Sequence, residues 1–382
     1  MTKSLSTFLN FLRWISALAV LAGHMRAFLF VPYPQLQSPG ILLKAFYYAT
    51  GFGHQAVMVF FVLSGFLVGG GVVQKIQDGT FVWKDYLVNR FSRLYPVLIA
   101  ALVVGGCLDY VGCHYFNSAG LYTIRGTDGV IGVINYNASQ RLGPKTFLVN
   151  LFMLQGIHGA TFGTNGPLWS LSMEFWYYLM FPVAALCLRT RTWKRLFCYN
   201  SLFLVGIVAF LPLEYDAYFV IWLMGVAAAA IRVPVRRALL WAAMLLAALA
   251  NSRAWIGGEA LSNALIGLSC ALVICAVKNG DGFPSVLAGI HERLSAFSYS
   301  VYLFHFPVLV FCLSVLNQSS LWNSSGGRSG RFGLFVVLMM LCVTASYVLS
   351  LFTEAKTPEV RSTLFSCLSI GRDRFRRLLK LA

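Results

Sequence analysis

Charged side chains are scarce in this sequence: they make up 11% of its 382 residues, whereas a soluble protein carries about 25%. Negative charge is the rarest, since 13 Asp and Glu stand against 30 Lys and Arg, a formal net charge of +17. With 58% hydrophobic residues, the deficit excludes a soluble enzyme, a disordered chain and a nucleic-acid-binding domain, in spite of a pI near 9.7. We predict a membrane protein that crosses the bilayer many times and whose positive charge reports its orientation.

Motifs for bound metals and nucleotides are also absent. The sequence has no Walker P-loop, no HExxH and no paired CxxC, and its six histidines are scattered, so we predict no metal site and no permanently bound cofactor. We interpret the nine cysteines as small apolar residues, with a disulfide between Cys107 and Cys113 as the alternative. The first apolar stretch contains Arg13 and His24 and lacks a small-residue cleavage site, which indicates a permanent helix and not a signal peptide.

Apolar segments of spanning length recur along the chain, and about 20 residues suffice for a helix to cross the hydrocarbon core. They lie at residues 8–30, 50–73, 94–113, 168–188, 197–212, 217–231, 237–250, 260–277, 296–317 and 332–353. The predicted fold is an all-α integral membrane bundle of about ten transmembrane helices. We assign residues 1–353 to the transmembrane domain and residues 354–382 to a basic cytoplasmic tail.

Basic residues are divided unevenly between the loops on the two sides of the membrane. With the N-terminus inside, the inner segments hold 21 Lys and Arg and the outer segments hold 8, while Arg13 lies within the first span. Cytoplasmic loops are enriched in Lys and Arg, so this division predicts that both termini are cytoplasmic.

Arg13 and His24 share the first span, and ionisable residues inside a span mark function by default. Eleven steps of about 100° return to within about 20° of the same helix face, and they cover roughly 16 Å. One stripe therefore carries a cation near the cytoplasmic side and an imidazole in the outer half. Two alternatives stay open: Arg13 snorkels to the headgroups, and His24 is a structural histidine.

Glu174 is the only acidic residue that we place deep inside a span. Its helix follows Asn165-Gly166-Pro167, a helix-start pattern, and enters from the outside to a depth like that of His24. We therefore expect Glu174 and His24 to meet in one outer-half cavity, where the carboxylate orients the imidazole. A pair that only neutralises charge and locks two helices together is the alternative.

Three further residues are candidates of lower specificity. His305 lies near the middle of the 296–317 span, where a structural role and a functional role are equally consistent with the sequence. Arg90 and Arg93 lie at the cytoplasmic mouth of the third span. Their close spacing suggests phosphate binding, although topology alone also explains basic residues there.

Four motifs in a fixed order resemble those of the membrane acyltransferase-3 family, and they extend over residues 13–307. They are Arg13-x10-His24 with Phe60-Phe61-Val62-Leu63-Ser64-Gly65-Phe66; Arg90-x-x-Arg93-Leu94-x-Pro96; Trp169-Ser170-Leu171-x-x-Glu174; and Tyr299-x-x-Tyr302-Leu303-x-His305. The resemblance implies a multi-pass enzyme of the bacterial inner membrane that moves an acyl group, usually acetyl from acetyl-CoA, onto sugar hydroxyls of surface glycans such as exopolysaccharide or O-antigen. Many members carry a fused hydrolase-like domain, and we expect this chain to be a single-domain form without one.

Carried over to this sequence, the resemblance implies catalytic His24, donor-binding Arg13, Arg90 and Arg93 near the coenzyme phosphates, and Glu174 in the active cavity. Our hypothesis is that His24 acts as a general base on a sugar hydroxyl, with an acyl-histidine intermediate as a variant. The expected partners are acetyl-CoA, a carbohydrate acceptor and membrane lipids, without nucleic acid. We assign further acceptor or oxyanion contacts to Trp169, Ser170, Tyr302 and His305.

Residues 114–166 are the expected acceptor platform on the outer side. The acceptor itself stays open, because a lipid, an antibiotic or a lipochitooligosaccharide also offers a hydroxyl. The alternative function is a proton-coupled transporter or flippase, in which Arg13, His24 and Glu174 form a proton relay.

Overall fold

The protein was analysed as a computed structural model, which describes most of the chain. The described residues are 1–118, 120–123, 134–189, 206, 210–231, 240, 242–244, 246–247, 258–279, 283–284, 286–318 and 328–378, with the backbone alone for 213–214, 328 and 370–378. Throughout these residues the secondary structure is helical, apart from one isolated β-bridge between Gln155 and Gly159. The all-α prediction is confirmed for this part of the chain.

Seven helical segments among the described residues are long and apolar enough to cross a membrane. Their main helices are α1 (Lys3–Leu29), α3 and α4 (Gly53–Ser64 and Gly70–Gln77, joined by a π-helical turn at Gly65–Gly69), α5 (Trp83–Tyr115), α7 (Leu168–Arg189), α12 (Glu259–Asn279), α14 (Ser298–Asn317) and α16 (Arg328–Phe352). A shorter apolar helix, α10 (Leu213–Ala230), corresponds to the predicted span at 217–231.

Shorter helices connect or flank these segments. They are α2 (Ile41–Ala49), α6 (Pro144–Leu151), α13 (Ala288–Ser295) and α17 (Thr357–Leu378), with 3-10 turns at Tyr33–Gln35, Ala138–Arg141 and Glu354–Lys356. The predicted spans at 197–212 and 237–250 lie largely outside the described residues, so ten spans and inner termini stay predictions. One boundary differs clearly: α5 begins at Trp83, not near residue 94, so Arg90 and Arg93 lie within the helix and not at its mouth.

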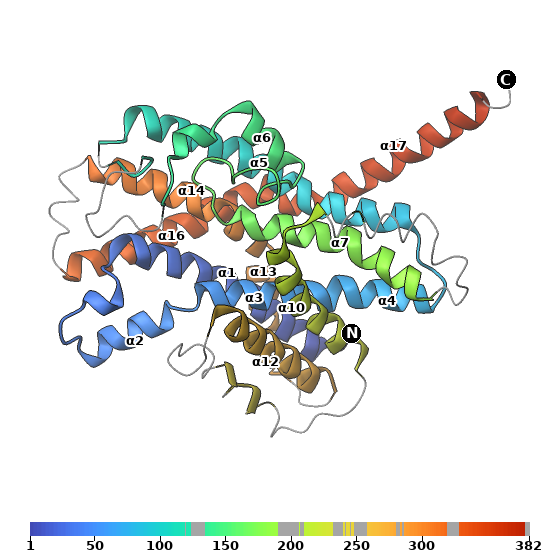
Figure 1. The fold of residues 1–382 in the computed structure, drawn as a ribbon, viewed down its shortest axis with the longest axis horizontal. Coiled ribbons are helices and arrows are strands. Elements are labelled where there is room, and N and C mark those ends of the chain that lie inside the picture. Colours follow the sequence, from blue (N-terminus) through green and yellow to red (C-terminus); the bar gives the residue numbers. More distant parts are fainter. Residues whose placement is uncertain are drawn as a thin grey trace.

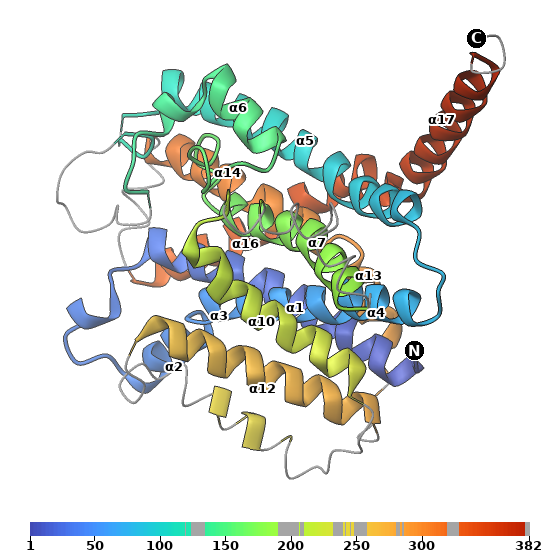
Figure 2. The same cartoon turned by 45° about the vertical axis from the view of Figure 1, so that its right-hand side comes forward.

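Helix α1 is central to the arrangement (Figures 1 and 2). It packs against α3, α13 and α14; α14 in turn packs against α5 and α16, and α10 packs against α3 and α12. Only the first part of α17 packs on α5, and the rest projects from the bundle in both views. A cavity lies where α1, α3, α5, α7, α14 and the start of α17 face one another.

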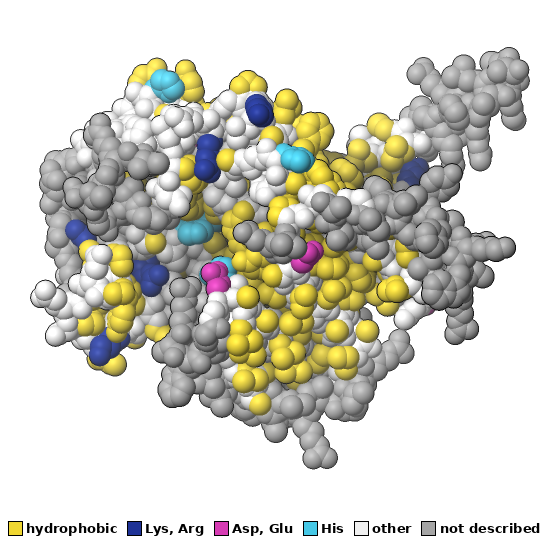
Figure 3. Space-filling view, in the orientation of Figure 1, with side chains coloured by type: hydrophobic (Ala, Val, Ile, Leu, Met, Phe, Trp, Pro, Cys, Tyr) yellow, Lys and Arg dark blue, Asp and Glu magenta, His cyan; other side chains and the backbone are white. Residues whose placement is uncertain are grey.

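Large apolar side chains remain exposed on the outside of the bundle. On α16 they include Val336, Val337, Met340 and Phe352, with exposed fractions of 60% to 75%. Figure 3 shows hydrophobic side chains covering much of one face, with few charged ones between them. Contiguous exposed apolar surface of this kind fits contact with lipid.

Candidate active site

A cavity of about 450 Å³ opens among these helices, within the size range of small-molecule sites. Its charged lining is strongly basic, since Arg13, Arg90, Arg93 and Arg361 face a single carboxylate, Glu174. Polar and aromatic groups complete the functional part of the wall: Ser64, Asn89, Ser170, Tyr178, Tyr299, Tyr302 and Thr357. An excess of guanidinium groups in a confined space favours an anionic ligand.

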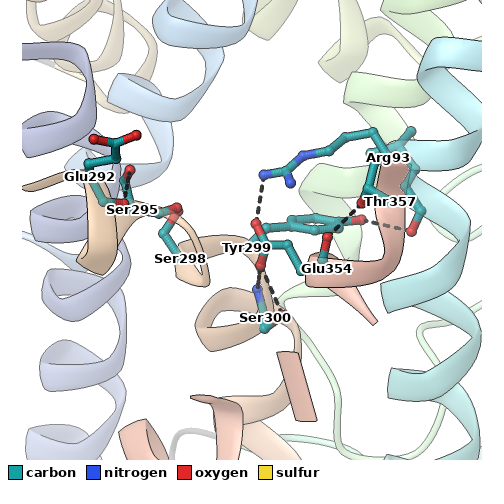
Figure 4. A network of polar contacts seen from close by, with 9 residues as sticks. Arg93, Glu292, Ser295, Ser298, Tyr299, Ser300, Glu354 and Thr357 are labelled. Atoms are coloured by element: carbon teal, nitrogen blue, oxygen red, sulfur yellow. Dashed lines mark hydrogen bonds and ion pairs between the residues drawn. The ribbon is translucent and has the colours of Figure 1, made fainter. Parts of the chain in front are cut away.

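One of these arginines already has an acidic partner. Arg93 Nη2 donates to Glu354 Oε1 at 2.6 Å, and the Glu354 side chain is 1% exposed. The other carboxylate oxygen, Oε2, accepts from the Ser300 N–H at 3.0 Å and from Ser300 Oγ at 2.9 Å (Figure 4). The ion pair with this buried carboxylate neutralises Arg93, so the expected phosphate contact of Arg93 is less favoured than that of the other arginines.

Arg13 and Arg90 differ from Arg93 because neither donates a hydrogen bond to a described residue. Arg90 lies over the Tyr178 ring, with its Cζ 5.7 Å from the ring centroid, and its buried Nε has no partner. Arg13 is half-buried on the cavity wall, which favours a binding role over snorkelling. Two guanidinium groups with free donors among the described residues therefore share one cavity.

Glu174 is held by a chain of hydrogen bonds whose direction is determined by its two ends. The Trp222 indole N–H only donates, and Ser64 Oγ accepts it at 3.0 Å. A carboxylate only accepts, and Tyr178 donates to Glu174 Oε1 at 2.5 Å. Ser64 must therefore donate its own proton to the Tyr178 oxygen, 3.0 Å away. The chain therefore orients the Glu174 carboxylate.

The two histidines form a pair, with His24 Nδ1 and His305 Nε2 2.9 Å apart. His305 Nδ1 lies 2.9 Å from the carbonyl oxygens of Val301 and Tyr302, which only accept, so this nitrogen carries the proton. His305 Nε2 is then an acceptor, and His24 Nδ1 must be protonated to donate to it. The remaining nitrogen of His24, Nε2, keeps its lone pair.

This geometry corrects one expectation from the sequence. His24 and Glu174 do not form the expected pair: His24 contacts His305, whereas Glu174 contacts Tyr178 and faces the arginines. The physical reason is that α1 packs against α3 and α14, and the sequence indicated only the depth of each residue. His24 and His305 are also absent from the cavity wall, although Tyr302, one helical turn before His305, lies on it.

Of the other residues predicted to contact a ligand, two line the cavity and one packs among aromatic rings. The Ser170 and Tyr302 hydroxyls are 2.6 Å apart on the cavity wall, and both oxygens lie near the Pro167 carbonyl. Trp169 instead packs against the rings of Phe61 and Tyr218. Ser170 and Tyr302 therefore remain candidate donors to a bound ligand, whereas Trp169 faces an aromatic cluster.

Two acidic residues besides Glu174 lie in the protein interior, Asp109 and Glu354, whereas the sequence led us to expect Glu174 alone deep inside a span. Asp109, 1% exposed, accepts from the Thr164 N–H at 2.6 Å and from Thr164 Oγ1 at 2.8 Å, which pins the segment before α7 onto α5. Asp109 falls inside the predicted 94–113 span, so the signal was present in the sequence. Glu354 directly follows the last apolar run, where nothing in the sequence distinguishes a buried acid from a solvated one.

The expected acceptor platform at 114–166 is only partly described, because residues 119 and 124–133 lie outside the described residues. Within the described part, Arg141 stacks on the Tyr136 ring with its Cζ 3.3 Å from the centroid, and burial raises the pKa of Tyr136. Cys107 and Cys113 are free thiols, so the alternative of a disulfide is wrong. No cluster of three or more metal-ligating side chains occurs in the described part of the chain.

Comparison with known proteins gives one family and several relatives. A family model described as an acyltransferase domain matches residues 6–351. The chain is 27% identical to "Acyltransferase MdmB" of Streptomyces mycarofaciens over 337 residues, 78% of this chain and 77% of that protein. It is 26% identical to an uncharacterized protein of Haemophilus influenzae over 156 residues, 40% of this chain and 56% of that protein. It is 27% identical to "Nodulation protein 10" of Rhizobium leguminosarum bv. viciae over 152 residues, 38% and 36% of the two chains. No solved structure matches.

Proposed function

Because the chain belongs to the membrane acyltransferase-3 family, whose domain covers residues 6–351, we propose that it is an O-acetyltransferase with acetyl-CoA as donor. The acceptor is a sugar hydroxyl of a cell-surface polysaccharide or its lipid-linked precursor, and the enzyme lies in the bacterial inner membrane. Family membership favours acyl transfer over the proton-coupled transporter, which would leave its substrate chemically unchanged.

The basic cavity is the observation that carries the donor assignment. Arg13 and Arg90 present guanidinium groups without ion-pair partners among the described residues, and coenzyme A offers a diphosphate and a 3′-phosphate. In the predicted orientation Arg13, Arg90 and Arg93 lie in the inner halves of α1 and α5. A donor arriving from the cytoplasm would therefore meet these groups first.

The separation of Arg13 and His24 along α1 is similar to the length of the pantetheine arm of this donor. Arg13 and His24 are eleven residues apart on α1, about 16 Å along the helix axis. The pantetheine arm of coenzyme A has a comparable length and carries two amides and a hydroxyl. Glu174, Ser170 and Tyr302 line the cavity and offer hydrogen-bond partners to such an arm.

His24 is the proposed general base. Its Nε2 takes the proton of the acceptor hydroxyl while that oxygen attacks the thioester carbonyl, which forms a tetrahedral oxyanion. Collapse of this intermediate breaks the carbon–sulfur bond, and the leaving thiolate takes the proton from His24. The products are an acetyl ester and free coenzyme A.

The decisive experiment is acetyl transfer by the purified protein in lipid nanodiscs, with radiolabelled acetyl-CoA and extracted surface glycans. We expect His24→Ala to lower kcat by about 100-fold or more, the usual contribution of a general base, with donor affinity unchanged. An active His24→Ala enzyme would rule out this role. Mass spectrometry of the labelled product identifies the acceptor.

A further inference from the structure

We propose that α17, which lies beyond the residues matched by the family model, completes the donor site and that Arg361 binds a phosphate of the donor. This inference rests on the proposed function, because it assumes a phosphorylated acyl donor. It changes the interpretation of the C-terminal segment, which the sequence indicated only as a basic tail.

The first part of α17 belongs to the cavity wall. Thr357 and Arg361, one helical turn apart, both line it. The segment is anchored on α5, where Lys84 lies over the Phe365 ring, with 5.9 Å from Nζ to the centroid. Thr357 Oγ1 also donates to the Glu354 carbonyl at 2.8 Å, which joins the start of α17 to the buried Arg93–Glu354 pair.

Arg361 is held in place without being neutralised. Its Nη1 donates to Asn89 Oδ1 at 3.2 Å, and Asn89 is itself oriented because its Nδ2 donates to the Asp85 carbonyl at 2.6 Å. A neutral amide positions the guanidinium but leaves its charge and its other N–H groups available. Arg361 forms no ion pair with a described residue.

Lys356, a cation close to Arg361 in the sequence, differs from it in both position and pairing. Lys356 pairs with Glu359 at 2.8 Å on the surface, where the two side chains are 49% and 68% exposed, and it does not line the cavity. Arg361 lines the cavity and has no acidic partner among the described residues, whereas Lys356, five residues earlier, is exposed and paired.

The placement of Arg361 also favours a phosphate over a single carboxylate. Asn89 directly precedes Arg90 on α5, so the Arg361–Asn89 bond brings Arg361 to the part of the cavity wall that Arg90 occupies. Two unpaired guanidinium groups on one cavity suit an anion with several oxygens, such as the diphosphate or 3′-phosphate of coenzyme A.

The test compares donor affinity in nanodiscs for Arg361→Ala, Arg361→Lys and the matched control Lys356→Ala, which removes one positive charge from the surface. The probes are coenzyme A, dephospho-coenzyme A and pantetheine, which lacks phosphate. We expect Arg361→Ala to weaken coenzyme A binding by about 10-fold or more, as for loss of a charged hydrogen bond, and to leave pantetheine binding unchanged. Arg361→Lys should fall between, and Lys356→Ala should bind like the wild type.

The outcomes separate this inference from the proposed function. Equal coenzyme A affinity of the wild type and Arg361→Ala, in a protein that still transfers acetyl groups, overturns the role of Arg361 alone. A wild type that binds coenzyme A no more tightly than pantetheine overturns the phosphorylated donor, and with it the basis of both. If the wild type and Arg361→Ala differ in affinity for coenzyme A but not for dephospho-coenzyme A, Arg361 binds the 3′-phosphate.

Discussion

At the scale of single residues, the hydrogen bonds of two imidazoles decide which nitrogen of His24 has a free lone pair. The carbonyls of Val301 and Tyr302 leave His305 one acceptor nitrogen, and this nitrogen in turn leaves His24 with a free lone pair on Nε2. The His305 imidazole thus occupies, relative to His24, the position that the carboxylate occupies in a serine hydrolase triad, and the two carbonyls fix its tautomer. In the sequence, His305 was only a lone histidine with a structural alternative.

A substitution at His305 tests this positioning role. We expect His305→Ala to lower kcat by about 10- to 100-fold while the donor KM stays near the wild-type value, since one orienting hydrogen bond is lost. His305→Gln should recover part of kcat, because the amide oxygen can accept from His24 Nδ1. Steady-state kinetics with acetyl-CoA measure both constants.

A purely structural histidine predicts another pattern. Glutamine would then help no more than alanine, and the loss would follow the amount of folded protein in both variants. Size-exclusion profiles of the two variants provide that control.

At the scale of elements, the helix series α3–α4 contacts α10 so closely that side chains are excluded at the crossing. A Cβ on Gly65 would lie 1.9 Å from the Trp222 carbonyl oxygen, and a Cβ on Gly225 would lie 2.0 Å from that of Val62. The π-helical turn begins at Gly65, directly after Ser64, which belongs to the hydrogen-bond chain to Glu174. Small residues at such crossings let helix backbones approach closely.

Gly65→Ala should therefore destabilise the bundle. We expect a loss of about 1–3 kcal/mol, typical of overpacking, because the obstacle is backbone and cannot rotate away. The matched control is Gly71→Ala on α4, where a new Cβ meets nothing within 4 Å. Thermal unfolding in detergent, followed by tryptophan fluorescence, compares the two variants.

The control variant Gly71→Ala has a separate expected result. Alanine has a higher helix propensity than glycine, so Gly71→Ala should be neutral or slightly stabilising. Equal melting temperatures for the two variants would show that α3 and α10 adapt at their crossing, contrary to the close contact described here.

At the scale of the whole molecule, the distribution of charge separates two functions of the basic residues. Most of the 30 Lys and Arg lie outside the spans predicted from the sequence, where their unequal division predicts the orientation. A few converge from α1, α5 and α17 on one cavity, which is basic because those helices assemble around it. Seven candidate spans lie among the described residues, and the shorter α10 and the predicted spans at 197–212 and 237–250 would bring the number to ten, an even number.

An even number of spans predicts that both ends of the chain lie on the same side, the cytoplasmic one. Green fluorescent protein fused to either terminus should fluoresce, and alkaline phosphatase at the same positions should be inactive. Activity of a C-terminal phosphatase fusion would contradict the ten-span topology, and it would place α17 and Arg361 on the outer side.

The sequence by itself determined the fold class, most spans and the family. Apolar runs are a local property, so helices such as α7 and α14 follow from composition and length. The motif residues Arg13, Arg90 and Glu174 were identified by their types and spacing, and they do share one cavity. The family followed from the same motifs.

Only the tertiary structure decided which of these residues contact one another. Helical periodicity gives a residue's face and depth but not the neighbouring helix, so the partner of His24 proved to be His305 and not Glu174. For the same reason, Glu354 could not be recognised as the partner of Arg93, nor Arg361 as a cavity residue. Pairing between segments distant in the chain depends on how the helices pack, and no local pattern in this sequence records that.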